Sequence, residues 1–209
     1  MTPRNTNGNS GKNPKDTVAA TTEDMPPADL YIDRMSASQA LAAMLANQAH
    51  AITALEAALP AIDAAADAAY QRLSTSDNGR LIYVGAGTSA RIGVQDGAEL
   101  PPTFNWPHHR IGFVIAGGEA ALLRAVENAE DSAETACTHI ADMGVAQNDV
   151  VIGLAASGST VFTTAALVAA GQALDLGCRT HVDVEPSHRR LDALALVGDE
   201  SEPPARPVV

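Results

Sequence analysis

The sequence predicts an α/β fold in which a doubly wound parallel sheet follows an N-terminal helical segment. From Arg80 onward, short apolar runs alternate with glycine-containing loops and helix-compatible stretches, which is the pattern of βα units. Apolar residues make up 46% of the 209-residue chain and aromatic residues only 3%, so the core must consist mainly of alanine, valine, leucine and isoleucine. Such side chains favour helices packed closely on a parallel sheet.

Composition divides the chain into four regions. Residues 1–27 are rich in asparagine, threonine, glycine, serine and proline, and they are expected to form a disordered lead because they bury too little apolar surface. Residues 30–75 are expected to be helical and residues 76–185 to form the α/β domain. Residues 186–209, dotted with proline and arginine, are expected to be an irregular tail.

The helical region has a clear start and one interruption. "SASQ" places Ser36 at the N-cap and Gln39 three positions later, which is a capping-box pattern. Pro60 is expected to end this first helix, and a second helix is expected over about residues 61–73.

Three strands are predicted in the α/β domain, at residues 80–84, 111–115 and 149–154, and "RTHVDV" (179–184) is a candidate fourth. The helix after the first strand is expected to stop at Pro101-Pro102. The next is expected to run from about Ala120 to Met143, and the last to about Leu176. Ligands of such sheets bind at the carboxyl ends of the strands.

Charge and cysteine content exclude several functions. Acidic residues outnumber basic ones 25 to 13, for a net charge of −12, so neither nucleic acid nor an anionic membrane is an expected partner. The sequence shows neither a signal-peptide pattern nor a span-length apolar stretch, which predicts a soluble, cytoplasmic protein. Cys137 and Cys178 lack the spacing of a zinc site, and the adjacent His108 and His109 favour a loop pair, so no metal is predicted.

Two strand-to-helix loops could hold an anion: "GAGTS" (85–89) and "AASGST" (155–160). Glycine lets the backbone approach a ligand, and the following helix offers free N–H groups. Ala90 breaks the dinucleotide fingerprint, and no Gly-Lys-Ser/Thr follows either loop. One such loop is more often a simple helix cap, but two at the carboxyl ends of strands in one sheet favour a phosphate and sugar hydroxyls. The candidate binding residues are Gly87, Thr88, Ser89, Ser157, Gly158, Ser159 and Thr160.

Three segments, "RLIYVGAGTSARIGVQDGAELPPTF", "IAGGEAALLRAVENAEDS" and "NDVVIGLAASGSTVFTTAAL", resemble the N-acetylmuramic acid 6-phosphate etherases over about residues 30–180. These belong to the sugar isomerase (SIS) domain superfamily of phosphosugar-binding α/β proteins. The resemblance implies a lyase that converts N-acetylmuramic acid 6-phosphate to N-acetylglucosamine 6-phosphate and D-lactate, in amino-sugar catabolism and peptidoglycan recycling. Together with the alanine-rich helices it suggests a homodimer. Proton transfers suffice for this chemistry, so no cofactor is implied.

The two functional carboxylates of that family fall on Glu99, in "AELPP", and Glu130, in "NAEDS". Elimination needs a base for the C2 proton of the ring-opened sugar and an acid for the departing lactate oxygen. Without the resemblance, the sequence indicates that Glu99 is an exposed residue at a helix end. It indicates that Glu130 belongs to a solvated helix face with Glu127, Asp131 and Glu134.

The sequence departs from the etherase pattern at Ala90, Ser159 and Val161, which replace glycine, arginine and proline. Loss of that arginine removes a charge-assisted donor. After Cys178 the strand and helical portion expected from the etherase pattern are not recognisable. A reading-frame change near codon 179 or a divergent truncation would produce such a sequence. An incomplete domain with impaired activity is therefore expected. A non-catalytic phosphosugar-binding module is the main alternative, and an aldose–ketose phosphosugar isomerase is a weaker one.

Overall fold

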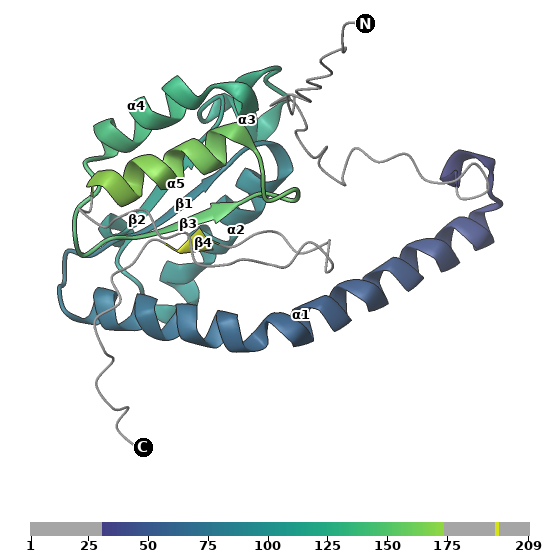
Figure 1. Cartoon of the computed structure of the whole chain (residues 1–209), viewed down its shortest axis with the longest axis horizontal. Coiled ribbons are helices and arrows are strands. Elements are labelled where there is room, and N and C mark those ends of the chain that lie inside the picture. The colour runs from purple at the N-terminus through teal and green to yellow at the C-terminus, as the bar shows by residue number, and fades with distance from the viewer. Residues whose placement is uncertain (1–30, 174–194, 197–209) are drawn as a thin grey trace, which may run out of the picture.

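The computed structural model describes residues 31–173 and 195–196 of the chain (Figure 1). The expected disordered lead, the candidate strand at 179–184, the end of the last helix and all but two residues of the expected irregular tail lie outside these ranges.

The sheet confirms the predicted α/β class. Its strand order is β2-β1-β3-β4, formed by β1 (Leu81–Gly85), β2 (Ile111–Ile115), β3 (Val150–Leu154) and the two-residue β4 (Ala195–Leu196). The central strand β1 runs parallel to both β2 and β3, whereas β4 is antiparallel to β3. The three predicted strands form within one residue of their expected positions.

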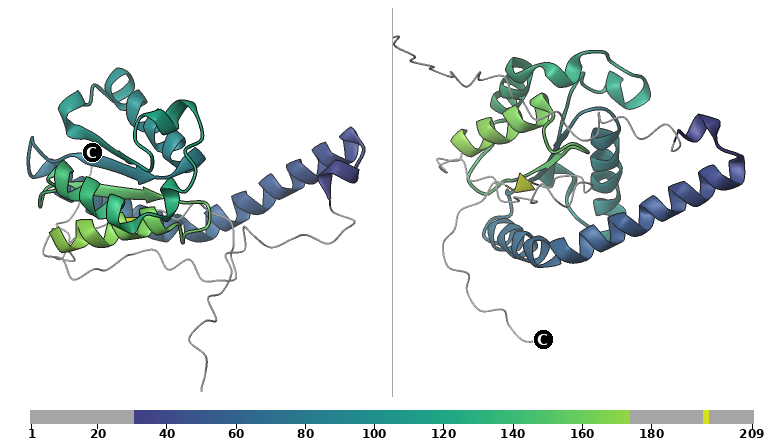
Figure 2. Two further views of the ribbon diagram at one scale, coloured as in Figure 1. Left: turned by 90° about the horizontal axis from the view of Figure 1, so that it is seen from above. Right: turned by 45° about the vertical axis from the view of Figure 1, so that its right-hand side comes forward.

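Helices cover both faces of this sheet (Figure 2). On one face, α4 (Ala133–Met143) and α5 (Val161–Ala173) bury Ile82 and Val84 of β1 in the larger core. On the other, α2 (Gly87–Phe104) and the short α3 (Ala120–Leu123) form a smaller core with Ile115. Successive residues of a strand point to opposite faces, so these five-residue strands serve both cores.

The expected break at Pro60 is wrong, because α1 is one helix over Ala37–Ser74 with Pro60 inside it. The predicted capping box at Ser36 and Gln39 is confirmed. A proline leaves one carbonyl of the preceding turn without its N–H partner. Since α1 buries none of its residues, water can hydrate that carbonyl and the helix continues.

The helix α2 also continues past its expected end. Pro101 and Pro102 lie inside its last turn, and the helix ends at Phe104. Proline has helical φ, so it interrupts hydrogen bonds here without forcing the chain to turn. The turn comes at Asn105, whose left-handed conformation (φ 53°) caps the helix.

The single helix expected from Ala120 to Met143 is wrong as well. The chain forms α3, then the 3₁₀ turn η5 (Ala129–Asp131), then α4. Asn128 is left-handed (φ 60°), which no α-helix accommodates, and Ser132 begins α4 by accepting a hydrogen bond from the Thr135 N–H. The four acidic residues from Glu127 to Glu134 therefore do not share one helical face.

Two arginines tie the amino ends of the strands to the helices. Arg80 forms an ion pair with the buried Asp149, at 2.6 Å, and donates to the carbonyls of Met143 and Gly144 at the end of α4. Arg110 is buried and donates to the carbonyl oxygens of Gly79 and Leu73. These contacts join α1, α4 and all three parallel strands at one edge of the sheet.

Replacing Asp149 with asparagine is expected to lower the free energy of unfolding at pH 7 by roughly 3 kcal/mol, because Arg80 loses its buried partner. Burial disfavours the charged carboxylate, but hydrogen bonds from Arg80 and the Ala146 N–H outweigh it and hold the pKa of Asp149 below its usual value. This stabilisation is present above the unfolded pKa, about 3.9, and is lost as pH falls through the folded one. Urea titrations at several pH values test this, with the exposed Asp77→Asn as control.

Gly79→Ala is expected to destabilise the fold by about 1–3 kcal/mol. Its Cβ would overlap the backbone carbonyl oxygen of Asn148, which cannot rotate away as a side chain can. Thermal unfolding of this variant and of the neighbouring exposed Asn78→Ala gives the comparison. Equal midpoints for the two variants would contradict the close approach.

Candidate functional site at the carboxyl edge of the sheet

The two glycine-containing loops leave the same edge of the sheet from neighbouring strands. Gly85, the last residue of β1, lies opposite Leu154, the last residue of β3. The connection from β1 leads to β2 on one side, whereas β3 lies on the other side of β1, so the order in which the parallel strands are added to the sheet reverses at β1. Open α/β sheets bind ligands at such a reversal point.

The first loop offers backbone donors in open space. The helix α2 begins at Gly87 (φ 54°), and no side chain among the described residues caps its N-terminus. The first N–H groups of an α-helix have no carbonyl partner within the helix, and they carry the positive end of its dipole. A Cβ placed on Gly87 would meet nothing within 4 Å, so a ligand can approach this backbone.

The conformation of the second loop is stabilised by hydrogen bonds among its own residues. Gly158 is left-handed (φ 68°), and its N–H donates to the Ala155 carbonyl. The Ser157 Oγ accepts a hydrogen bond from the Ser159 N–H at 3.2 Å and lies 3.2 Å from the Ser159 Oγ. Ser157, Gly158 and Ser159 are exposed, and Thr160 is half-buried at the start of α5. A hydroxyl that accepts from the backbone keeps its proton for a ligand.

Glu99 lies far from this edge within one chain. It is exposed on α2, twelve residues after Gly87, which corresponds to roughly 18 Å along the helix axis at 1.5 Å per residue. Beyond it, the end of α2 borders an open hollow of about 670 Å³. The hollow is lined by Pro101, Pro102, Asn105, Trp106, Pro107 and His108.

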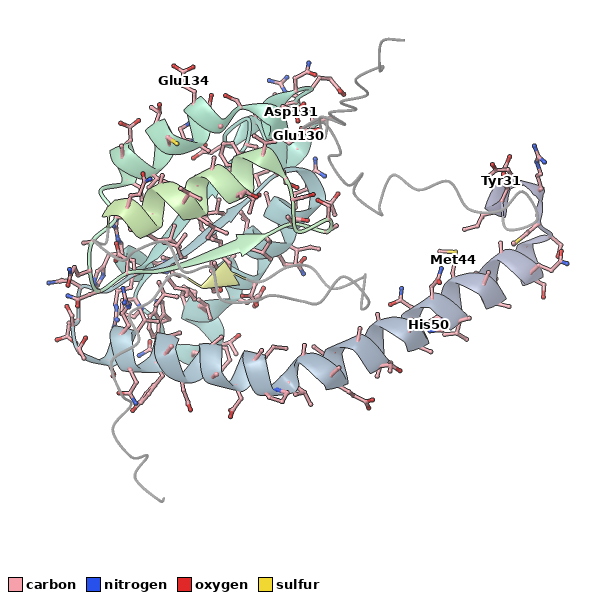
Figure 3. The ribbon with its side chains drawn as sticks, in the orientation of Figure 1. Tyr31, Met44, His50, Glu130, Asp131 and Glu134 are labelled. Atoms are coloured by element: carbon pink, nitrogen blue, oxygen red, sulfur yellow. The ribbon has the colours of Figure 1, made fainter. Side chains whose placement is uncertain are left out.

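Glu130 lies on the other face of the sheet. It is exposed in η5, whose Ala129 packs against the larger core beside α5. Figure 3 shows Glu130 next to Asp131 where α4 begins, and Glu134 directed away from the domain. One chain therefore brings the two loops together but keeps the two glutamates on opposite faces.

Asp96 is a polar residue near Glu99 that is not among the candidate site residues predicted from the sequence. The buried Tyr83 donates a hydrogen bond from its hydroxyl to the Asp96 Oδ2 at 2.5 Å. Burial raises the pKa of Tyr83, and the hydrogen bond and negative charge of Asp96 raise it further. Asp96 precedes Glu99 by three residues, so both lie on one side of α2. The signal was present in "QDGAE", where two acids have helical spacing.

Residues 31–173 and 195–196 contain neither a candidate metal site nor a membrane-spanning helix. No group of three or more histidine, cysteine, aspartate or glutamate side chains there could hold a metal ion. None of the helices there combines the length and the apolarity needed to cross a membrane.

Comparison with known proteins supports the resemblance seen in the sequence. The curated N-acetylmuramic acid 6-phosphate etherase of Psychromonas ingrahamii is 42% identical over 70% of this chain and 48% of its own length. Those of Pasteurella multocida and Serratia proteamaculans are 40% and 43% identical over 78% of this chain, and 52% and 53% of their own lengths. The chain thus spans about half the length of the curated relatives it matches.

A family model described as the glucokinase regulatory protein N-terminal SIS domain matches residues 65–171, which is about half of the chain. The match covers β1, β2 and β3 together with both glycine-containing loops. The parallel sheet, its helices on both faces and this match agree, and the chain belongs to that family of SIS domains.

Proposed function

We propose that this chain is the SIS domain of an N-acetylmuramic acid 6-phosphate etherase, a cytoplasmic carbon–oxygen lyase of amino-sugar catabolism and peptidoglycan recycling. The observation that carries the proposal is the pair of hydroxyl-rich loops at adjacent parallel strand ends, in a chain 40–43% identical to proteins of that name.

The substrate phosphate would lie between the two loops. The free N–H groups at the start of α2 and the hydroxyls of Ser89, Ser157 and Thr160 are its proposed donors. A chain with a net charge of −12 does not attract a phosphate at long range, so the donors must act locally. Once anchored, the phosphate supplies binding energy that positions the reacting carbons of the sugar.

The two glutamates would divide the proton transfers. One removes the C2 proton of the ring-opened sugar, and the C2–C3 double bond forms as the C3–O bond breaks. The other gives its proton to the departing lactate oxygen. Water then adds at C3 and a proton returns to C2, which gives N-acetylglucosamine 6-phosphate and D-lactate. The C–O bond that breaks and the C–O bond that forms are each accompanied by proton transfers among the carboxyl groups, the substrate and water.

A second copy of the chain would complete the site. Glu99 and Glu130 lie on opposite faces of one sheet, so a homodimer is a direct way to bring the two carboxylates to one sugar. The helix α1 offers the contact surface, because it extends away from the domain and buries none of its residues (Figure 1). Its exposed apolar stripe consists of Leu41, Met44, Leu45, Ile52, Leu55 and Leu59. Contiguous exposed apolar surface of this kind marks interaction sites.

Exchange of either Glu99 or Glu130 for glutamine is expected to slow D-lactate release by about a hundredfold or more, because an acid or base is lost. Binding of N-acetylglucosamine 6-phosphate should survive both changes. Ser157→Ala should instead weaken binding first, because it removes a phosphate donor. Enzymatic detection of D-lactate and calorimetric titration with the sugar phosphate measure the two effects.

Glu134→Gln is the matched control, since that carboxylate points away from the domain, and it should leave both quantities unchanged. Lactate release at the unmodified rate by Glu130→Gln would remove Glu130 from the mechanism. A chain that binds the sugar phosphate but releases no lactate would favour the non-catalytic binding module.

Charging the α1 stripe is expected to separate the dimer. Leu45→Lys combined with Leu55→Lys places two cations in the apolar contact, whereas Asn47→Lys with Ala57→Lys puts the same charges on exposed positions outside the stripe. Light scattering across protein concentrations should give a monomer for the first variant and a dimer for the second. A monomeric unmodified chain would contradict the proposed assembly.

A further inference from the structure

Arg91 connects the first loop to the segment that follows β2. It lies in the second turn of α2 and is half-buried. Its Nε donates to the carbonyl oxygen of Ala121 in α3 at 3.2 Å, and its Nη1 donates to the Thr88 Oγ1 at 3.4 Å. Thr88 is one of the exposed residues at the start of α2, so the guanidinium lies beside the proposed phosphate site.

The charge of Arg91 is not neutralised by these two contacts, because a carbonyl and a hydroxyl are neutral acceptors. Arg80 and Arg110 act at the opposite edge of the sheet. Arg80 pairs with Asp149, and Arg110 donates to the carbonyl oxygens of Gly79 and Leu73. The second loop, "AASGST", contributes hydroxyl and N–H groups but no cationic side chain. Residues 85–91 and 155–164 comprise the two loops and the helix starts that follow them, and within these ranges Arg91 is the one residue with a positive charge.

The contact with Thr88 also fixes the direction of a donor. A threonine hydroxyl has one proton to donate and two lone pairs with which to accept. When its oxygen accepts from a guanidinium, the proton is left for another partner, and the hydroxyl becomes a stronger donor because the cation polarises it. A phosphate above the loop is the partner that such a donor suits.

We propose that Arg91 is a positioning residue of the phosphate site, which supplies its positive charge and turns the Thr88 hydroxyl toward the anion. This inference rests on the proposed phosphosugar-binding function. It adds a residue outside both glycine-containing loops to the donors of that site.

Calorimetric titration with N-acetylglucosamine 6-phosphate, and with N-acetylglucosamine as the uncharged counterpart, tests the assignment. Arg91→Gln is expected to weaken binding of the phosphorylated sugar about tenfold or more, because charge-assisted hydrogen bonds are worth about one power of ten or more in affinity. Binding of the uncharged sugar should not change. Arg34→Gln, which removes the same charge from the exposed turn η3 (Ile32–Arg34), is the matched control and should bind as the unmodified chain does.

Two further variants separate charge from structural support. Arg91→Lys keeps the cation and should recover part of the affinity. Ser159 is exposed in the second loop, so Ser159→Arg in the Arg91→Gln background presents a cation from the other side and should also recover part. Support of α3 alone would not be repaired by Ser159→Arg, because that residue lies in the other loop, so a double variant that binds as weakly as Arg91→Gln would overturn the inference.

The remaining outcomes distinguish this inference from the function on which it rests. Full affinity in Arg91→Gln together with weak binding in Ser157→Ala would overturn the role of Arg91 and keep the phosphate site. If the unmodified chain binds the phosphorylated sugar no better than the uncharged one, the proposed function and the role of Arg91 both fail.

Discussion

The buried carboxylate of Asp149 is the point on which the rest of the sheet depends. It accepts hydrogen bonds from the backbone and side chain of Arg80, just before β1, and from the N–H of Ala146, just after α4. The neighbouring Val150 N–H donates to the Arg80 carbonyl, which sets Leu81 opposite Val150. A charge this deeply buried is tolerated only when it is paired and fully hydrogen-bonded. The register that this pairing fixes at the amino edge places the ends of β1 and β3 level at the carboxyl edge.

The two edges of the sheet therefore have opposite chemical characters. At the amino edge the charged groups are occupied: Arg80 by Asp149 and by helix-terminal carbonyls, and Arg110 by two carbonyls and the face of Trp106. At the carboxyl edge none of the side chains that the structure describes caps the start of α2, and the second loop exposes its hydroxyls. The contacts at the amino edge stabilise the fold, whereas the hydrogen-bond donors at the carboxyl edge remain available for a ligand.

The strands and the two loops could be predicted from the sequence, because an apolar run followed by glycine and a helix start is a local pattern. The sequence was insufficient at Pro60, Pro101 and Pro102. The effect of a proline on a helix depends on whether water can reach the freed carbonyl, and that is a property of the folded surface. The break at Asn128 was equally hidden, since asparagine tolerates both helical and left-handed backbone.

The positions of the glutamates depend on strand order, which no local pattern contains. Because β1 lies between β2 and β3, the crossovers that follow β1 and β2 run in opposite directions along the sheet. Right-handed crossovers that run in opposite directions lie on opposite faces. The same central position of β1 thus brings the two loops together and separates Glu99, on α2, from Glu130, in η5.

Because α1 is exposed, the stability of this helix is expected to depend on protein concentration. At 38 residues it extends about 57 Å, and none of its residues is buried against the domain. In a lone protomer the N-terminal half of this helix, which extends away from the domain, depends mainly on intrinsic helix propensity and water-exposed hydrogen bonds, and it is the first part expected to open. A partner that covers the apolar stripe binds only the folded helix, so its binding free energy adds to the stability of that helix. Dilution would then loosen this arm while leaving the sheet, which Asp149 holds, unaffected.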